Sequence, residues 1–301
     1  MKVAKCWKDF EILDATGGQK LERWGKILLA RPDPQVVWNQ PRISADWERV
    51  HAIYHRSASG GGNWEIARPL PEQWEISYRQ LKFAVRPTGF KHTGLFPEQA
   101  ANWDVLDELL GGCASDFEVL NLFAYTGGAT LACAAAGAKV CHVDASKGMV
   151  TWARQNAQLS GLEQHPIRWI VDDCQKFVAR EIRRGRSYGG VIMDPPSYGR
   201  GPGGEVWKLE DCIYDLLKEA TALLDKGSRF FLLNSYTAGL SPWVMKYMLD
   251  ALIVPRLGGQ VLCYELGLSV SATGGVLPCG GSALWVTKST EENIKGLQNE
   301  Q

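Results

Sequence analysis

The sequence lacks the marks of several protein classes. Its 33 Lys and Arg balance its 33 Asp and Glu, so the formal net charge is zero. A zero balance argues against a protein that binds nucleic acid by unspecific electrostatic attraction, although it permits an enzyme with a local basic patch. No run approaches the ~18 apolar residues of a membrane span. The N-terminus carries charges where a signal peptide has an apolar core.

Metal-ligand spacing is also missing. None of the eight cysteines forms a CxxC pair, and the five histidines show no ligand pattern, so we expect no metal site. Several cysteines, such as Cys133, lie in apolar stretches, which is typical of small buried side chains in a reduced, cytoplasmic protein. No Ser-His-Asp arrangement is found either.

Residues 1–85 differ from the rest of the chain. They hold six of the twelve tryptophans, and short strand-like runs such as residues 26–30 alternate with turn signals, for example at residues 60–63. This pattern predicts a small β-rich N-terminal domain or extension. Its tryptophans either fill a small core, which we favour for most of them, or form an exposed surface that grips a substrate.

A second domain is expected over residues 86–301, in which strands and helices alternate before a polar, loose tail at 289–301. Strands are expected at 117–123, 139–143, 167–171, 190–193 and 229–233, and helices at 97–110, 128–136, 146–159, 173–184, 207–224 and 242–252. The alternation predicts an α/β domain with a parallel sheet and helices on both faces. Two late strands are expected at 260–266 and 283–287, and no helix separates them, only a glycine-rich loop at 271–282. They are therefore expected to form a hairpin. A plain dinucleotide-binding domain does not need this hairpin.

Ligands of open α/β sheets bind beyond the carboxyl ends of the strands, and several ends here carry suitable groups. The first strand runs into residues 124–128, whose glycines let the backbone approach a ligand closely. Asp144 ends the second strand and can accept both hydroxyls of a ribose. Asp172 and Asp173 end the third strand. Each aspartate can instead cap a helix, but three strand ends in the same order favour a ligand site.

The fourth strand leads into Asp194, two prolines, Ser197 and Tyr198. A proline fixes φ at about −65° and has no N–H group, so this short rigid loop presents carbonyl oxygens and a carboxylate to a cleft. Tyr198 offers a face for stacking; the alternative is a rigid turn with Tyr198 in the core. The glycines after the first strand lack the GxGxxG spacing, which disfavours a nicotinamide-dependent dehydrogenase.

The runs NLFAYTGG (121–128) and DPPSYG (194–199) resemble motifs I and IV of class I S-adenosylmethionine-dependent methyltransferases, and most of all the bacterial 23S rRNA large-subunit methyltransferase family. Residues 93–99 resemble that family's TGLFx[DE]Q run, and residues 277–285 resemble its LPxG…W segment. The resemblance covers residues 86–288. It implies a seven-stranded Rossmann-like sheet whose last strand is antiparallel, and S-adenosyl-L-methionine as the cofactor.

The resemblance also implies roles for single residues. Asp173, with Asp172 close behind, accepts from the adenine amine, and Phe96 and Gln99 lie over the methionine end of the cofactor. The expected cofactor-binding residues are Phe96, Gln99, Asn121, Phe123, Ala124, Tyr125, Thr126, Gly127, Asp144, Ala145, Ser146, Asp172, Asp173, Cys174 and Asp194. The expected catalytic residues are Asp194, Pro195, Pro196 and Tyr198, and the expected substrate-binding residues, as phosphate contacts, are Arg200 and Lys208.

The acceptor implied by the resemblance is a base of RNA, ribosomal RNA in particular, that is single-stranded or flipped out of its helix. The Asp194 loop would accept hydrogen bonds from an amino group of this base, and stacking on Tyr198 is worth about 1–3 kcal/mol. Carbon-5 methylation of cytosine needs a cysteine nucleophile, which such relatives carry just after the fifth strand. Residues 232–237 contain no cysteine, so we prefer a nitrogen target, either an exocyclic amine or guanine N7.

Other interpretations stay open. The zero net charge also permits a methyltransferase for a small molecule or a protein, and a non-catalytic cofactor-binding module is a further alternative. The N-terminal residues do not show the RNA-binding domain with which the rRNA enzymes of that family begin. The oligomeric state is open, with a homodimer among the options, and no membrane association is expected.

Overall fold

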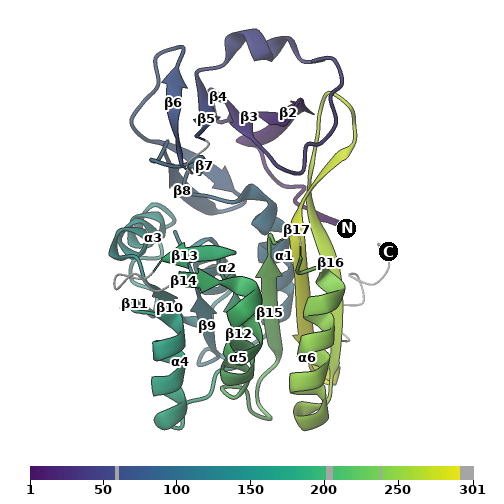
Figure 1. The fold of residues 1–301 in the computed structure, drawn as a ribbon. Helices are drawn as coiled ribbons and strands as arrows, with labels where there is room; N and C mark the ends of the chain where they lie inside the picture. Colours follow the sequence, from purple (N-terminus) through teal and green to yellow (C-terminus); the bar gives the residue numbers. More distant parts are fainter. Residues whose placement is uncertain (58–60, 201–205, 238, 292–301) are drawn as a thin grey trace.

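The computed structural model describes residues 1–57, 61–200, 206–237 and 239–291. Its lower part in Figure 1 is an α/β domain on one mixed sheet with the strand order β1-β16-β17-β15-β12-β9-β10-β11, and its upper part is a smaller β-rich region. Both the α/β class and the β-rich N-terminal region are therefore confirmed. The strands of the large sheet are β1 (Lys2–Val3), β9 (Glu118–Leu122), β10 (Lys139–Asp144), β11 (Ile167–Val171), β12 (Gly190–Met193), β15 (Phe230–Ser235), β16 (Gln260–Ser269) and β17 (Val276–Val286).

Five neighbouring strands of this sheet run parallel, and β17 is antiparallel to both β15 and β16. This is the seven-stranded arrangement that was expected, with β1 added at the edge beside β16. The helices of this domain are α1 (Ala100–Leu110), α2 (Gly128–Ala135), α3 (Lys147–Leu159), α4 (Cys174–Arg183), α5 (Leu209–Thr221), α6 (Pro242–Leu257) and α7 (Lys288–Glu291), and the short 3-10 helix η2 (Pro97–Gln99) precedes α1.

Helices cover both faces of the large sheet. In Figure 1, α4, α5 and α6 lie in front of the sheet, and α1 and α2 lie behind it. The front core contains Phe177, Leu216 and Leu249, and the back core contains Leu106 and Cys133. Every residue of β12 and β15 is buried, as expected for central strands covered on both sides.

Side-chain caps determine where several helices begin. Ser146, Asp173 and Ser241 accept hydrogen bonds from the backbone N–H groups three residues later, at the starts of α3, α4 and α6. The helix expected at 242–252 continues to Leu257 through Pro255, and the buried Ile253 keeps this last part on the core. No helix within the described ranges is long and apolar enough to cross a membrane.

Two predicted boundaries were wrong, because pairing between strands changes where these elements begin and end. The helix expected from residue 207 begins at Leu209, since β14 (Val206–Lys208) pairs with β13 (Tyr198–Arg200) as a hairpin. The two late strands are longer than expected, because β16 and β17 stay paired up to Ser269 and Val276. Most of the run expected to be a glycine-rich loop is therefore part of strand β17.

The N-terminal strands form a five-stranded sheet and a separate hairpin, β7–β8. Figure 1 places this sheet above the carboxyl edge of the large sheet. Trp24 and Trp47 are buried, and the other four N-terminal tryptophans are partly buried, so the core interpretation is confirmed for most of them. The strands are β2 (Phe10–Thr16), β3 (Gln19–Trp24), β4 (Ile27–Pro32), β5 (Ala52–Arg56), β6 (Gly62–Ile66), β7 (Trp74–Tyr78) and β8 (Leu81–Val85), and a 3-10 helix η1 (Ala45–Arg49) precedes β5.

Backbone hydrogen bonds connect the N-terminal region to the large domain at two separate places. Near the start of the chain, β1 pairs with β16. The turn between β16 and β17 reaches up to β2, where the N–H groups of Ser271 and Ala272 donate to the carbonyl oxygens of Ile12 and Leu13 at 2.9 and 3.0 Å. These backbone contacts hold the N-terminal sheet over the carboxyl ends of the parallel strands.

Candidate functional site

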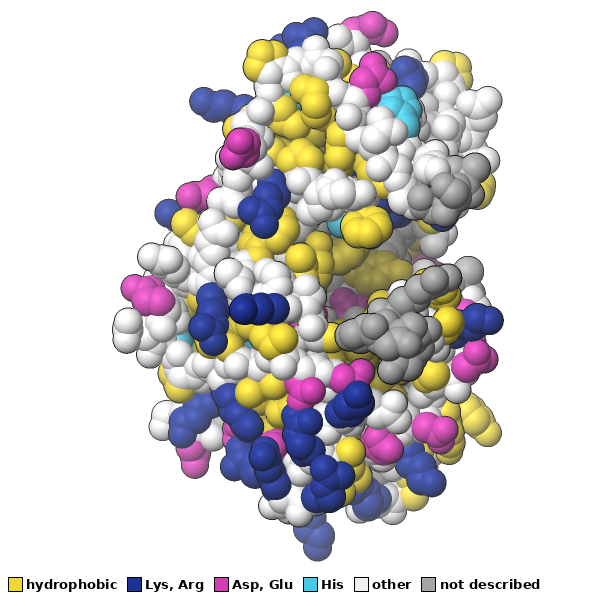
Figure 2. All heavy atoms as spheres, turned by 60° about the vertical axis from the view of Figure 1, so that its left-hand side comes forward, with side chains coloured by type: hydrophobic (Ala, Val, Ile, Leu, Met, Phe, Trp, Pro, Cys, Tyr) yellow, Lys and Arg dark blue, Asp and Glu magenta, His cyan; other side chains and the backbone are white. Residues whose placement is uncertain are grey.

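The carboxyl ends of the parallel strands meet below the N-terminal sheet. Figure 2 shows a hollow between the two regions, with hydrophobic side chains along its walls and an acidic side chain at its depth. The motifs singled out in the sequence lie on the loops that follow β9, β10 and β12. This edge is where open parallel sheets bind their ligands.

The loop after β9 has an unusual backbone. Phe123 and Tyr125 adopt φ values of 55° and 50°, in the left-handed region that residues other than glycine rarely enter. Such a conformation costs on the order of 1–3 kcal/mol per residue and is concentrated at ligand sites. Asp144 holds the loop, because its carboxylate accepts from the N–H groups of Tyr125 and Ser146, both at 2.8 Å.

Gly127 completes this loop and brings it close to α3. Its φ is 89°, and a Cβ atom at this position would lie 3.1 Å from the Cβ of Ala153. The Thr126 hydroxyl donates to the carbonyl of Gly94 at 2.5 Å, and the Asn156 side chain donates to the carbonyl of Thr126 at 2.9 Å. The loop is thus tied both to α3 and to the segment 93–99.

The segment 93–99 connects the loop after β9 to the end of β15, and a contact of Phe96 and Gln99 with the cofactor stays a prediction. The Phe96 ring lies between those of Tyr125 and Tyr236, with centroid distances of 5.5 Å to each. The Gln99 amide donates to the Tyr236 hydroxyl at 2.7 Å and accepts from Asn102 at 2.8 Å. These contacts join the loop after β9 to the end of β15.

A buried polar network that the sequence analysis missed supports Gln99. Asn102 donates to Asn234 at 3.0 Å and to Ser282 at 3.1 Å, and it accepts from the Tyr264 hydroxyl at 2.8 Å. Ser282 also donates to Asn234 at 2.8 Å. Asn234, Tyr264 and Ser282 are 132 to 180 residues away from Asn102 in the chain, so no local pattern could reveal the network. The available signal was a polar residue, Asn234, at the end of an apolar strand.

Asp194 lies at the centre of the edge, directly after β12. Among the described residues, none donates a hydrogen bond to its carboxyl group. Burial, together with the nearby carboxyl group of Glu98, raises the pKa of Asp194 to about 7. A partly buried carboxyl group that has no hydrogen-bond donor among the described residues suits a ligand that donates hydrogen bonds to it.

The remainder of the Asp-Pro-Pro loop continues into the β13–β14 hairpin. The carbonyl of Pro196 accepts from the indole of Trp207 at 2.7 Å, so this oxygen holds the hairpin in place. Tyr198 is 53% exposed, so the interpretation that it fills the core is wrong. Lys208 is exposed at the end of β14, whereas Arg200 ends β13 and its side chain lies outside the described part of the structure.

Two residues expected to bind the cofactor lie beneath the loop after β9. Asn121 is buried and donates to Thr130 of α2 at 2.9 Å. Cys174 is buried and its sulfur accepts from the N–H of Phe123 at 3.2 Å. Both support the loop from below, and a direct contact with the cofactor stays a prediction for them. Ala145 and Ser146 are exposed at the start of α3.

Asp172 and Asp173 end β11 and make hydrogen bonds within the protein. Asp173 accepts from the N–H of Lys176 at 2.9 Å and so caps α4. Asp172 forms an ion pair with Arg180. Asp173 therefore caps a helix, as the alternative interpretation expected. Its contact with an adenine amine, through the second carboxylate oxygen, stays a prediction.

The arginines near the end of α4 belong to a different surface. Arg168, Arg184 and Arg186 surround the buried Glu181 at 3.5, 2.8 and 3.8 Å. Figure 2 shows Lys and Arg side chains gathered on the lower part of this face, away from the hollow. We interpret them as a solvated, ion-paired face.

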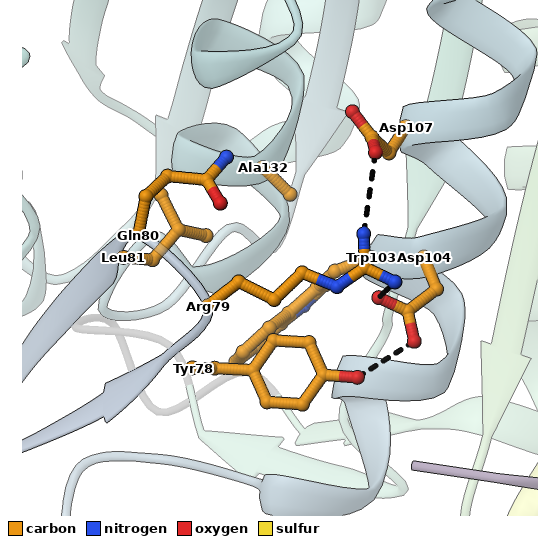
Figure 3. Close-up of a pocket in the computed structure, with 8 residues that line it drawn as sticks. All are labelled: Tyr78, Arg79, Gln80, Leu81, Trp103, Asp104, Asp107 and Ala132. Atoms are coloured by element: carbon orange, nitrogen blue, oxygen red, sulfur yellow. Dashed lines mark hydrogen bonds and ion pairs between the residues drawn. The ribbon is translucent and has the colours of Figure 1, made fainter. Parts of the chain in front are cut away.

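A small pocket between the β7–β8 turn and α1 is shown in Figure 3. Tyr78 donates to Asp104 at 2.6 Å, and Arg79 lies 3.1 Å from Asp104 and 3.4 Å from Asp107. Because these polar groups satisfy one another, we interpret the pocket as a structural contact between the N-terminal region and α1.

Known proteins establish the family. A family model described as S-adenosylmethionine-dependent methyltransferase matches residues 4–234. The chain belongs to this family. A crystal structure of a methyltransferase of this type from Agrobacterium tumefaciens is 37% identical, with a TM-score of 0.88 over 95% of this chain and 93% of that chain. The predicted fold class and the enzyme class are thereby confirmed.

Curated relatives of this methyltransferase are named ribosomal RNA large subunit methyltransferase K/L. The one from Pseudoalteromonas atlantica is 29% identical over 67% of this chain and 26% of the relative. The one from Magnetococcus marinus is 32% identical over 62% of this chain and 24% of the relative. The methyltransferase therefore spans about a quarter of the length of these relatives.

The methyltransferase uses S-adenosylmethionine, and its site fits this cofactor. The strained loop after β9 lies at the carboxyl edge of the sheet, where such folds bind ligands, and Gly127 lets it pack closely against α3. Asp144 would hold the ribose, Phe96 would cover the methionine end, and the carboxyl group of Asp194 has no partner among the described residues.

Proposed function

We propose that this methyltransferase acts in the cytoplasm on a nitrogen atom of an RNA base, with ribosomal RNA as the first candidate. The relatives named as ribosomal RNA methyltransferases support RNA as the acceptor and partner. The observation that supports the nitrogen target is the carboxyl group of Asp194, which has no hydrogen-bond partner among the described residues and lies near Tyr236 at the end of β12. Such a group accepts a hydrogen bond from an amino group and can take its proton.

The proposed reaction depends on alignment and exclusion of water. The bound cofactor supplies a methyl group on a sulfonium centre. Tyr198 stacks on the acceptor base, since its ring is 53% exposed beside the loop. Asp194 orients the amino group and receives, at a carboxylate oxygen, the proton that the nitrogen loses. The N-terminal sheet lies above the strand ends in Figure 1, where it would limit the access of water from this side.

The positions of the cysteines disfavour carbon-5 methylation. Tyr236 follows β15, in the region where cytosine-5 relatives carry a cysteine. Cys279 of β17 lies near Tyr236, but its thiol donates to the carbonyl of Leu277 at 3.2 Å. Burial and the charge of Glu98 raise the pKa of Cys279 well above its ordinary value, so this thiol stays protonated and is a poor nucleophile.

The test is a methyl-transfer assay with methyl-tritiated S-adenosylmethionine. The acceptors are deproteinised total RNA, ribosomal subunits and a small-molecule extract, all from cells that lack this gene. Radioactivity in one ribosomal RNA supports the proposal, and mass spectrometry of its nucleosides then locates the methyl group. A methyl group on C5 of a pyrimidine contradicts the nitrogen target, and counts confined to the extract contradict RNA as the acceptor. Asp194→Asn is expected to lower kcat by about 10²- to 10⁴-fold.

A further inference from the structure

Tyr236 directly follows β15, and its ring is held between two other segments of the chain. The Phe96 ring lies against it, with 5.5 Å between the ring centroids and an angle of 34° between the ring planes. Gly280 of the LPxG segment, in β17, is the second neighbour, because a Cβ atom there would lie 3.0 Å from the Tyr236 ring. The φ of Gly280 is 134°, which favours glycine. The missing side chain at position 280 therefore leaves the space that the Tyr236 ring fills.

The hydrogen bonds of Gln99 determine which role the Tyr236 hydroxyl has left. Gln99 Oε1 accepts from the side-chain amides of Asn102 and Asn234 at 2.8 and 3.3 Å, so the amide nitrogen of Gln99 faces Tyr236. This nitrogen donates to the phenolic oxygen at 2.7 Å. A tyrosine hydroxyl has one proton to donate and holds it at neutral pH. In the described part of the chain no residue accepts this proton, so it is available to a ligand.

Tyr236 and Asp194 lie at the ends of neighbouring strands. β12 is paired in parallel with β15 along its whole length, so both residues lie at the same part of the carboxyl edge. The loops that follow the two strands are in contact, because the Thr237 hydroxyl donates to the Ser197 hydroxyl oxygen at 2.8 Å. A hydrogen-bond donor at Tyr236 and a hydrogen-bond acceptor at Asp194 therefore face the site from adjacent loops.

A donor next to an acceptor suits the edge of a planar base. In adenine, cytosine and guanine, an exocyclic amino group lies beside a ring nitrogen that accepts hydrogen bonds, whereas uracil has no amino group. Proteins read unpaired bases through hydrogen bonds to such edges. When the amino group of a base donates to Asp194, the ring nitrogen beside it needs a donor, which the Tyr236 hydroxyl can supply.

We propose that Tyr236 selects the acceptor base by donating its hydroxyl proton to the ring nitrogen beside the amino group that Asp194 binds. This inference rests on the proposed function and deepens it, because it requires a base with an amino group as the acceptor. Gln99 is then a positioning residue, since it occupies the phenolic oxygen as a donor and leaves the proton for the base.

Binding of short single-stranded ribo-oligonucleotides tests this contact. Each oligonucleotide carries one adenosine, cytidine or guanosine within a run of uridines. Its partner carries the analogue in which C–H replaces the ring nitrogen, which is 1-deazaadenosine, 3-deazacytidine or 3-deazaguanosine. Fluorescence anisotropy gives Kd for the full chain with S-adenosylhomocysteine bound. For the preferred base, we expect the analogue to bind about 2- to 12-fold more weakly, as for the loss of one hydrogen bond.

Tyr236→Phe removes the hydroxyl and keeps the ring. This variant is expected to bind the natural base about 2- to 12-fold more weakly than the unmodified protein does, and to show equal Kd values for the natural base and its analogue. Equal values are diagnostic, because any disturbance of Gln99 weakens the binding of both oligonucleotides alike. Binding of S-adenosylhomocysteine, measured by calorimetry, is expected to be unchanged.

Tyr264→Phe is the matched control. The Tyr264 hydroxyl donates to Asn102 at 2.8 Å, so this variant disturbs the same network but removes no donor to the base. We expect the ratio of the Kd values for the analogue and the natural base to stay as in the unmodified protein.

Four results separate this inference from the proposed function. If Tyr236→Phe weakens the binding of natural base and analogue by the same factor for all three bases, the inference is overturned and the proposed function stands. Weaker binding of S-adenosylhomocysteine alone also overturns it, because the hydroxyl then serves the cofactor. The expected Kd pattern in a protein that transfers no methyl group to RNA supports the contact and contradicts the proposed reaction. Binding of every oligonucleotide no tighter than that of oligouridylate contradicts both.

Discussion

The replacement Glu22→Gln examines a buried cluster of charges in the N-terminal region, which Lys20, Glu22, Arg31 and Asp33 form. The side chain keeps its shape but loses its charge, so Arg31, which is 5% exposed, retains a buried positive charge without its bidentate partner. Lys20 loses its contact with Glu22 as well, although it keeps Asp33 at 3.1 Å. Removing one partner of a buried pair costs about 3–5 kcal/mol, and we expect a loss of this size in the free energy of unfolding.

The same sheet offers a matched control in Glu11→Gln. Glu11 pairs with Arg23 at 2.9 Å, but these side chains are 35% and 31% exposed. Water screens such a pair, so we expect a loss of about 1 kcal/mol or less. Urea unfolding at neutral pH, followed by tryptophan fluorescence, measures both variants. Trp24 is a local reporter, because its indole donates to Glu22 at 3.1 Å.

The test compares the loss in the free energy of unfolding between Glu22→Gln and Glu11→Gln. A stabilising role of the buried cluster would be refuted if Glu22→Gln lowered the free energy of unfolding by no more than Glu11→Gln does. The ion pairs of Glu22 would then contribute no more stability than an exposed ion pair. Combining Glu22→Met with Arg31→Met supplies the second check. This double variant is expected to be more stable than Glu22→Gln, because it leaves no unpaired cation at position 31.

Gly127→Ala is expected to destabilise the protein by about 1–2 kcal/mol through its left-handed φ of 89° and further through crowding, since its Cβ would lie 3.1 Å from that of Ala153. Gly137→Ala, at φ 95° in open space, measures the backbone part alone, and equal losses in thermal denaturation would show that crowding contributes nothing. Tyr198→Ala is expected to raise KM for RNA by about 5- to 150-fold, because it removes the ring on which the base stacks. Tyr198→Phe keeps the ring and is expected to leave KM unchanged. Equal KM values for the two variants would contradict stacking. Burial disfavours the charge of Glu22, but its cation partners outweigh this and lower its pKa from 4.5 to about 2. The stability that this carboxylate contributes is therefore present above pH 4.5 and lost as pH falls toward 2, so acid unfolding of Glu22→Gln should show a smaller slope in that range, and an unchanged slope would contradict the assignment.

The parallel strands and the glycine-containing loop could be predicted because their signals are local. β12 and β15 are buried along their whole length, and such strands appear in a sequence as short unbroken apolar runs. The loop after β9 and the aspartates at the strand ends follow from the same reading, since each comes directly after an apolar run.

The elements that were missed depend on partners far away in the chain. The β13–β14 hairpin and the extensions of β16 and β17 exist because two segments pair, and neither segment has a strong strand signal by itself. The network around Asn102 arises only when α1 is packed against the ends of β15, β16 and β17. A polar residue in an apolar stretch was the only trace of these contacts in the sequence.

The attachment of the turn between β16 and β17 to β2 limits how far the N-terminal sheet can move away from the strand ends. The N-terminal sheet is joined to the large domain near the start of the chain, through β1, and near its end, through Ser271 and Ala272. Swinging it away would break backbone hydrogen bonds at both places, each worth about 0.5–1.5 kcal/mol. We therefore expect the N-terminal sheet to keep its position over the strand ends when a substrate binds.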